Sequence, residues 1–148
     1  MSQQTPPTNQ KTWFIIFFAL VASIGTYGLL CFFVTQNPTR PISPTLATMR
    51  PFFIALAVAA LMAAVAWLRF RVDGQIGGEG RPVTMSPAQF QTGTIIALAL
   101  SEACAIFGLV LFFLGAPLGE FALFALGSVF VDLAFVLPRG IQFWATQK

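Results

Sequence analysis

The hydrophobic pattern of this chain consists of four long apolar stretches, separated by segments rich in polar and turn-forming residues. A membrane-spanning helix needs about 20 apolar residues to cross the ~30 Å hydrocarbon layer of a bilayer. The stretches therefore predict four transmembrane helices, over residues 13–34, 52–68, 93–114 and 118–137. Residues 1–148 would then form a single all-α membrane domain, in which residues 1–10 are expected to be a disordered tail.

Turn-forming residues predict where these helices begin and end. Three prolines lie in the connector 36–50, and four glycines lie in the longest loop, 69–91. No Gly-Lys-Ser/Thr follows these glycines, so we interpret the loop as a flexible connector and not as a phosphate site. Residues 86–89, Ser-Pro-Ala-Gln, form a capping box with proline at the first helical position, which predicts the start of the third helix. The fourth helix is expected to end at residues 138–140, Pro-Arg-Gly.

Composition supports a membrane protein and excludes several classes of function. Hydrophobic residues make up 57% of the chain and charged residues 9%, and the mean hydropathy is +0.80. A soluble domain carries about 25% charged residues, so lipid must solvate most of this chain.

The basic residues are scattered, which argues against nucleic-acid binding. The chain has no histidine, so a Ser/His/Asp set is impossible. Because Cys31 and Cys104 lie in different apolar stretches, no metal site, haem or other cofactor is expected.

The distribution of charge predicts the orientation of the chain. With four spans, the N-terminus, the loop 69–91 and the C-terminus share one side, which carries six of the eight basic residues. The other side carries only Arg40 and Arg50. The positive-inside rule therefore places both termini in the cytoplasm, and we expect the bacterial inner membrane as the location. Three tryptophans at the cytoplasmic helix ends are expected to be interface anchors: Trp13, Trp67 and Trp144.

The chain also matches itself at an offset of 80 residues. Residues 13–34 superpose on residues 93–114 with matching Ile-Ile, Ala-Leu, Gly-Leu and Phe-Phe pairs. Both stretches would begin in the cytoplasm, so the predicted fold is two related hairpins in the same orientation. Apolar sequence of low complexity can also produce such a match by chance. The alignment sets Glu102 opposite Ala22, so only the second hairpin carries this carboxylate.

Glu102 is an acid near the middle of the third predicted helix. An ionised carboxylate at the centre of a bilayer costs about 2.5–3.5 kcal/mol on insertion scales, so it needs a proton or a partner. Such residues are functional by default, and the alternative is a structural acid that hydrogen-bonds to a neighbouring helix. A stripe of small residues beside Glu102 predicts a close helix interface: Ala97, Ser101, Ala105 and Gly108.

Asp132 is a second acid within a predicted helix, and it shares a helical face with Ser128. Glu102 lies fifteen residues before the centre of the last tight turn and Asp132 fifteen after it. Both acids are therefore expected at about 22 Å from that turn. Asp132 could face the bundle interior and meet Glu102, or it could reach the interface near Arg139. Glu120, at the mouth of the fourth helix, is interpreted as a solvated charge.

The residues around Glu102 resemble the ion-binding helix of proteolipid subunit c of the rotary F- and V-type ATPases. That helix has a carboxylate four residues before an Ile-Tyr-Gly-Leu-Val-like run, and residues 106–110 here read Ile-Phe-Gly-Leu-Val. An Arg and a Pro precede the family's carboxylate in its polar loop, as Arg81 and Pro82 do here. In the family this helix is the second of a hairpin and packs on a glycine-rich helix. Here it is the third of four, and the 52–68 span carries alanines.

The resemblance implies a membrane subunit in which Glu102 binds and releases H⁺ or Na⁺ during ion translocation, next to Ser101, Ala105 and Gly108. Its expected partners are the lipid bilayer and other membrane subunits or further copies of this chain. Two alternatives remain open from the sequence. The first is an accessory or scaffold subunit of a larger membrane complex, and the second is a small proton-coupled exporter.

Overall fold

The computed structural model describes residues 10–36, 43–76 and 85–147. The predicted tail, residues 1–10, lies outside these ranges except for Gln10.

Four helices are long and apolar enough to cross a membrane, as predicted, and the chain is an integral membrane protein by this criterion. The elements in order are α1 (Gln10–Thr35), α2 (Leu46–Trp67) with the π-helical turn η1 (Leu68–Asp73), α3 (Pro87–Phe113), and α4 (Leu118–Val131) with the π-helical turn η2 (Asp132–Val136) and α5 (Leu137–Ala145).

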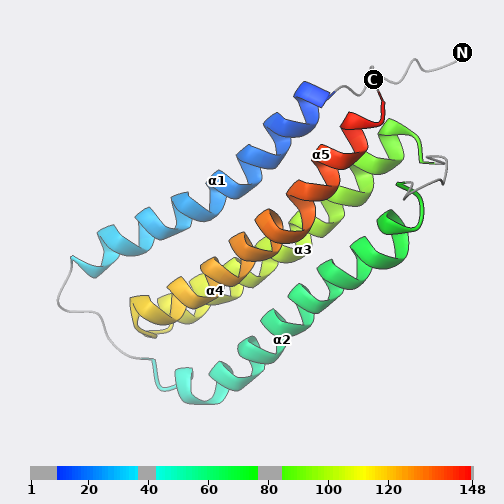
Figure 1. Cartoon of the computed structure of the whole chain (residues 1–148). Helices are drawn as coiled ribbons and strands as arrows, with labels where there is room; N and C mark the ends of the chain where they lie inside the picture. The colour runs from blue at the N-terminus through cyan, green and yellow to red at the C-terminus, as the bar shows by residue number, and fades with distance from the viewer. Residues whose placement is uncertain (1–9, 37–42, 77–84, 148) are drawn as a thin grey trace, which may run out of the picture.

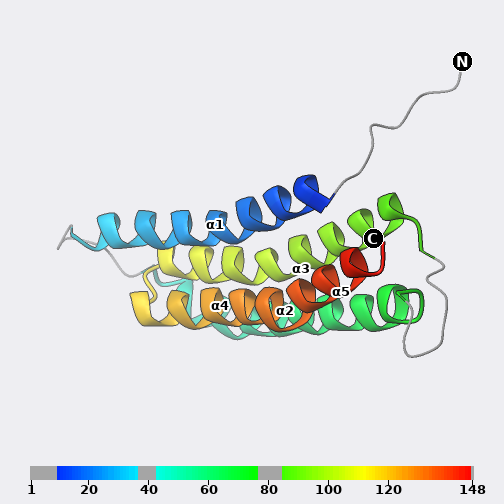
Figure 2. The same cartoon turned by 45° about the horizontal axis from the view of Figure 1, so that its top comes forward.

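The helices form a bundle in which successive spans run in opposite directions (Figure 1). The start of α1 and the end of α5 lie at the same end of the bundle, called here the terminal end. The α3–α4 turn lies at the other, called the turn end. Helix α3 is central, because it packs against α1, α2 and α4, whereas α1 packs on α3 and α4 rather than on α2 (Figure 2).

Helices α1 and α3 lie side by side and parallel. Near the terminal end, Trp13 Nε1 donates to Thr94 Oγ1 at 2.8 Å, a contact between residues 81 positions apart in the sequence. Further along, Ser23 contacts Glu102, a pair 79 positions apart. Residues of the two helices that differ by about 80 in number therefore lie at the same level of the bundle.

Both ends of α3 have the local structure that their residues favour. At the start, Gln89 N donates to Ser86 Oγ at 3.3 Å and Ser86 N donates to Gln89 Oε1 at 3.0 Å, which confirms the predicted capping box. At the end, Gly115 adopts a φ of 110°, which favours glycine. Its N–H binds the Phe112 carbonyl, and the next N–H binds the Leu111 carbonyl, as in a Schellman motif. This turn fixes where α4 begins.

The second span is longer than the predicted 52–68. Helix α2 begins at Leu46, inside the segment interpreted as a connector, and contains Pro51. A proline this close to the helix start removes a single backbone hydrogen bond, the one to the carbonyl of Ala47. This loss is tolerated because Ala47 is exposed. The prediction also ended the helix too early, because the backbone continues as a π-helical turn to Asp73.

The fourth span does not end at Pro138, as predicted, but continues to Ala145. Pro138 lies in the first turn of α5, directly after η2, where a missing N–H is tolerated. Arg139 Nη1 donates to the Phe135 carbonyl at 2.7 Å, and so binds a carbonyl of the π-helical turn. Tertiary contacts hold α5 on the bundle, because the Phe143 ring stacks on Phe90 with centroids 4.1 Å apart.

An aromatic core at the terminal end joins all four spans. Trp13 is 1% exposed and Trp144 is 6% exposed, so both are packed inside the protein. The prediction that they are interface anchors is therefore wrong. Trp67 is partly buried and donates Nε1 to the Gly93 carbonyl at 3.0 Å. The three tryptophans do lie at the same end, as predicted, but they pack there between helices.

The stripe of small residues on α3 forms the predicted helix interface. Ala97, Ser101 and Ala105 are fully buried. At Gly108, a Cβ atom would lie 2.6 Å from the Cβ of Phe124 on α4, closer than two such atoms can approach. The absence of side-chain bulk along this stripe therefore sets the distance between α3 and α4.

Candidate functional site

Glu102 lies near the middle of α3 and faces α1. Its Oε1 accepts a hydrogen bond from Tyr27 OH at 2.8 Å and another from Ser23 Oγ at 2.5 Å. Tyr27 and Ser23 are four residues apart, so one helical face presents both hydroxyls. Tyr27 is the only tyrosine of the chain, and Glu102 is partly buried. A carboxylate from α3 is thus bound by two hydroxyl groups from α1.

Asp132 lies on the side of α3 that faces α4, at the junction of α4 and η2. It is 1% exposed and accepts a hydrogen bond from Ser101 Oγ. Ser128, on the same face as Asp132, donates to the Ser101 carbonyl at 2.7 Å and is fully buried. The face that carries Ser128 and Asp132 therefore looks into the bundle. The alternative in which Asp132 reaches the interface near Arg139 is wrong, because Asp132 is buried and Arg139 pairs with Asp73 instead.

The two acids lie at the same level of the bundle but bind different partners. Asp132 contacts Ser101, the residue directly before Glu102, which agrees with the equal depths predicted from the turn. The two carboxyl groups use separate hydroxyl donors, Glu102 those of α1 and Asp132 that of α3. The result is a row of carboxyl and hydroxyl groups that crosses α3 from α1 to α4.

Arginines pair with two other acids at the ends of the bundle. At the terminal end, Arg139 makes a two-point contact with Asp73, in which Nη2 lies 2.6 Å from Oδ2. At the turn end, Arg50 Nε lies 2.8 Å from Glu120 Oε1. Glu120 is only 8% exposed, so its interpretation as a solvated charge is wrong. The first turn of α4 places it against α2, where Arg50 supplies the counter-charge.

The acids of the described residues therefore fall into two kinds. Asp73 and Glu120 lie at helix ends and are neutralised by arginine. Glu102 and Asp132 lie within the spans and are bound by hydroxyl groups, with no Lys or Arg in ion-pair contact among the described residues. Arginine supplies a full counter-charge to an acid, whereas a hydroxyl group supplies only a hydrogen bond.

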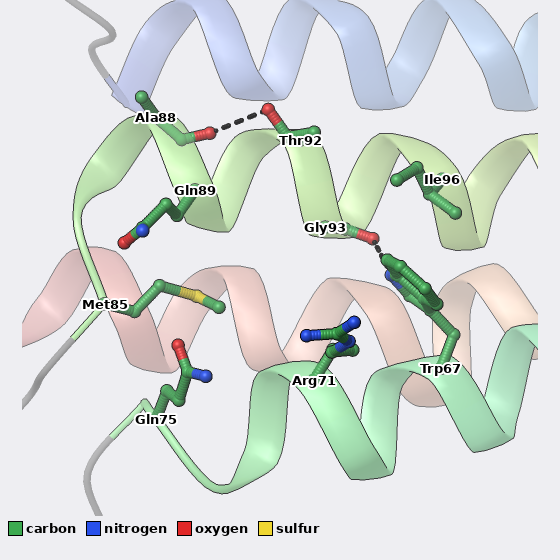
Figure 3. Close-up of a pocket in the computed structure, with 9 residues that line it drawn as sticks. All are labelled: Trp67, Arg71, Gln75, Met85, Ala88, Gln89, Thr92, Gly93 and Ile96. Atoms are coloured by element: carbon green, nitrogen blue, oxygen red, sulfur yellow. Dashed lines mark hydrogen bonds between the residues drawn. The ribbon is translucent and has the colours of Figure 1, made fainter.

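A pocket of about 480 Å³ lies at the terminal end, between α2–η1 and the start of α3 (Figure 3). Arg71 lies over the Trp67 ring at 5.5 Å from its centroid. Gln75 and Gln89 line the same space from the two sides. These polar groups are near the surface, and the pocket is separated from the acids of the bundle interior by about two turns of α3.

The sequence did not identify Ser23 and Tyr27 as site residues. Hydroxyl residues are common in apolar helices, and nothing local distinguishes these two from Thr26, which donates to the Ala22 carbonyl of its own helix at 3.2 Å. The one available signal was the offset of 80 residues, which aligns the neighbourhood of Ser23 with that of Glu102. This offset shows that the two helices are similar in sequence, but it does not predict that they are neighbours.

No protein-family model, no curated protein and no solved structure matches this chain.

Proposed function

We propose that this chain is a subunit of an ion-translocating membrane complex, and that Glu102 reversibly binds a proton, or Na⁺, within the membrane. The supporting observation is a carboxyl group near the middle of an apolar helix that is bound only by hydroxyl groups among the described residues. The local resemblance of residues 99–110 to ATPase proteolipids supports the same proposal.

The surroundings of Glu102 act on its two protonation states in opposite directions. Apolar neighbours and lipid favour the neutral acid, because a charge in hydrocarbon is costly. The hydroxyls of Ser23 and Tyr27 donate to the carboxylate and favour the ionised form. No arginine of the described residues pairs with Glu102, so under this proposal a movement of α1 relative to α3 would alter the hydroxyl contacts that bind its carboxyl group.

The finer architecture belongs to the same proposal. We infer two related hairpins, residues 10–73 and 87–145, with both termini in the cytoplasm. The parallel alignment of α1 and α3 at an offset of about 80 residues supports the repeat, and the excess of basic residues near the terminal end supports the orientation.

The orientation is tested by cysteines introduced at exposed positions. In intact cells, an impermeant thiol reagent is expected to label Thr45→Cys and to leave Gln75→Cys and Gln147→Cys unlabelled, because only the turn end would face outward. Cys31 and Cys104 are both buried and serve as the background. Labelling at Gln75 without labelling at Thr45 would reverse the orientation.

Protonation of Glu102 is tested with dicyclohexylcarbodiimide, a hydrophobic reagent that modifies protonated carboxyl groups. We expect one principal adduct, on Glu102, mapped by mass spectrometry. Glu102→Gln is expected to abolish the adduct while the protein remains folded. The matched control, Glu120→Gln, removes an acid that pairs with Arg50 and should leave the adduct in place. An adduct on Glu120 in the native protein would contradict the site assignment.

A scaffold role is the second candidate, because both hydrogen-bond donors to Glu102 come from one helix. In this case Glu102 serves to hold α1 against α3, and no proton is exchanged. The labelling experiment distinguishes the two functions. A Glu102→Gln protein that fails to assemble, together with a native protein that is not labelled, favours the scaffold.

A further inference from the structure

An apolar groove of about 580 Å³ runs between α2 and α4 at the turn end of the bundle. It is separate from the hydroxyl-bound acids of the proposed function. Its walls are formed by Ile54, Val58, Leu61, Leu123, Phe124 and Gly127. Among the described residues, its charged lining residues are Arg50 and Glu120. The groove therefore combines a long apolar surface with one cation and one anion.

The carboxyl group of Glu120, a residue that lines this groove, has an unused hydrogen-bonding atom. The Glu120 side chain is 9% exposed, and its Oε1 accepts from Arg50 Nε at 2.8 Å. Its Oε2 is buried, and no donor from the described residues reaches it. A buried carboxylate oxygen without a donor is unfavourable, so a ligand that donates hydrogen bonds would stabilise this position.

Arg50 offers the complementary charge at the same place. Its side chain is 56% exposed, and only Nε is used in the contact with Glu120. No contact of its two terminal nitrogens with the described residues is seen, so they can bind an anion, and the planar guanidinium group suits phosphate. A ligand that carries a hydrogen-bonding cation next to a phosphate would therefore match Glu120 and Arg50 together.

We propose that this groove is a binding site for phosphatidylethanolamine. The primary ammonium of the headgroup donates to Glu120 Oε2, the phosphate binds Arg50, and one acyl chain lies along the apolar walls. The lining residues of α2 extend from Arg50 to Leu61, a length of about 16 Å at 1.5 Å per residue, so the groove can follow an acyl chain inward from the headgroup level.

Native mass spectrometry of the detergent-solubilised full chain tests this site. The chain is titrated with phosphatidylethanolamine, phosphatidylcholine and phosphatidylglycerol that have identical acyl chains. Phosphatidylcholine has the same net charge as phosphatidylethanolamine, but its quaternary ammonium has no N–H to donate. We expect the native chain to bind phosphatidylethanolamine about tenfold more tightly than phosphatidylcholine, the effect of one charge-assisted hydrogen bond.

Three variants locate the site. Glu120→Gln should remove the preference for phosphatidylethanolamine, because the amide is neutral. Gly127→Leu should weaken binding of all three lipids by filling the groove, since a Cβ there meets only the flexible end of Leu61, at 3.4 Å. Asp73→Asn removes an acid at the terminal end, outside the groove, and should change nothing.

Equal binding of the two zwitterionic lipids by the native chain would overturn the proposal. So would a preference that survives Glu120→Gln, or one that is lost in Asp73→Asn. If Glu120→Gln proves unstable, Gly127→Leu still decides the matter: undiminished lipid binding in this variant contradicts the groove as the site. The proposed proton site does not enter these outcomes, because Glu102 is unchanged in every variant.

Discussion

Gly140→Ala is expected to destabilise the protein by about 1–3 kcal/mol, the usual cost of forcing extra atoms into a packed core. A Cβ at this position would lie 2.0 Å from Cη2 of Trp13, far inside the contact distance of two carbon atoms. The indole of Trp13 has no room to move. It is 1% exposed, its Nε1 donates to Thr94, and its ring stacks on Phe17 with centroids 5.5 Å apart.

The overlap must therefore be relieved by moving α5 away from α1. The measurement is unfolding in detergent, followed by circular dichroism during thermal or dodecyl sulfate denaturation. Gly25→Ala is the matched control, because it makes the same substitution within α1 at a position where a Cβ meets no atom within 4 Å. This control is expected to be neutral or slightly stabilising, since alanine favours helix. Equal stability of the two variants would show that α5 does not pack on Trp13.

The double variant Ser23→Ala, Tyr27→Phe is expected to loosen α1 and to expose Glu102 to chemical modification. Both hydroxyls that bind the Glu102 carboxyl group are removed, while the ring of Tyr27 is kept and the helix propensity at residue 23 is not lowered. Polar contacts between helices in membranes are worth about 0.6 kcal/mol on average and up to ~1.7 kcal/mol, so we expect a loss of about 1–3 kcal/mol for the pair. With both hydroxyl partners removed, the Glu102 carboxyl group is more accessible, so carbodiimide labelling of Glu102 should become faster.

A double-mutant cycle with Glu102→Gln measures this coupling directly. In the background of Glu102→Gln, in which the carboxyl group has been replaced by a neutral amide, the Ser23 and Tyr27 substitutions should cost much less stability. Thr26→Ala, on the same helix, removes a hydroxyl that binds only the Ala22 carbonyl among the described residues, and it is expected to change neither stability nor labelling. Additive effects in the cycle would separate Ser23 and Tyr27 from Glu102 and leave the carboxyl group without its proposed partners.

The partners of the acids differ between the ends and the middle of this bundle. The arginine pairs Asp73–Arg139 and Arg50–Glu120 lie at the two ends, where headgroups and water reduce the cost of charge. The hydroxyl-bound acids lie between them, in the apolar part of the spans. Arginine pairs can therefore hold the helices together at the two ends, and it is under the proposed function that the interior acid Glu102 exchanges a proton.

The sequence by itself determined the membrane class, the number of spans and the local structure at the start of α3. Four apolar stretches with few charges can be solvated only by lipid, and this requires neither partner contacts nor register. The start of α3 was predictable for the same reason, because a capping box involves only residues 86–89. The depth of Asp132 relative to Glu102 followed from the helical rise and the position of one turn.

The tertiary structure alone decided which residues surround each acid and how far the helices extend. The rotation of a helix about its axis is not encoded in an apolar stretch that is hydrophobic on every face, so the facing of Glu102 toward Ser23 and Tyr27 could not be read from composition. The burial of Glu120 likewise depends on its ion pair with Arg50, and the continuation of the last span past Pro138 depends on the ion pair of Arg139 with Asp73. Both partners lie far away in the sequence. Local residues set the tendency of each helix to end, but contacts with other spans supplied the energy that extended it.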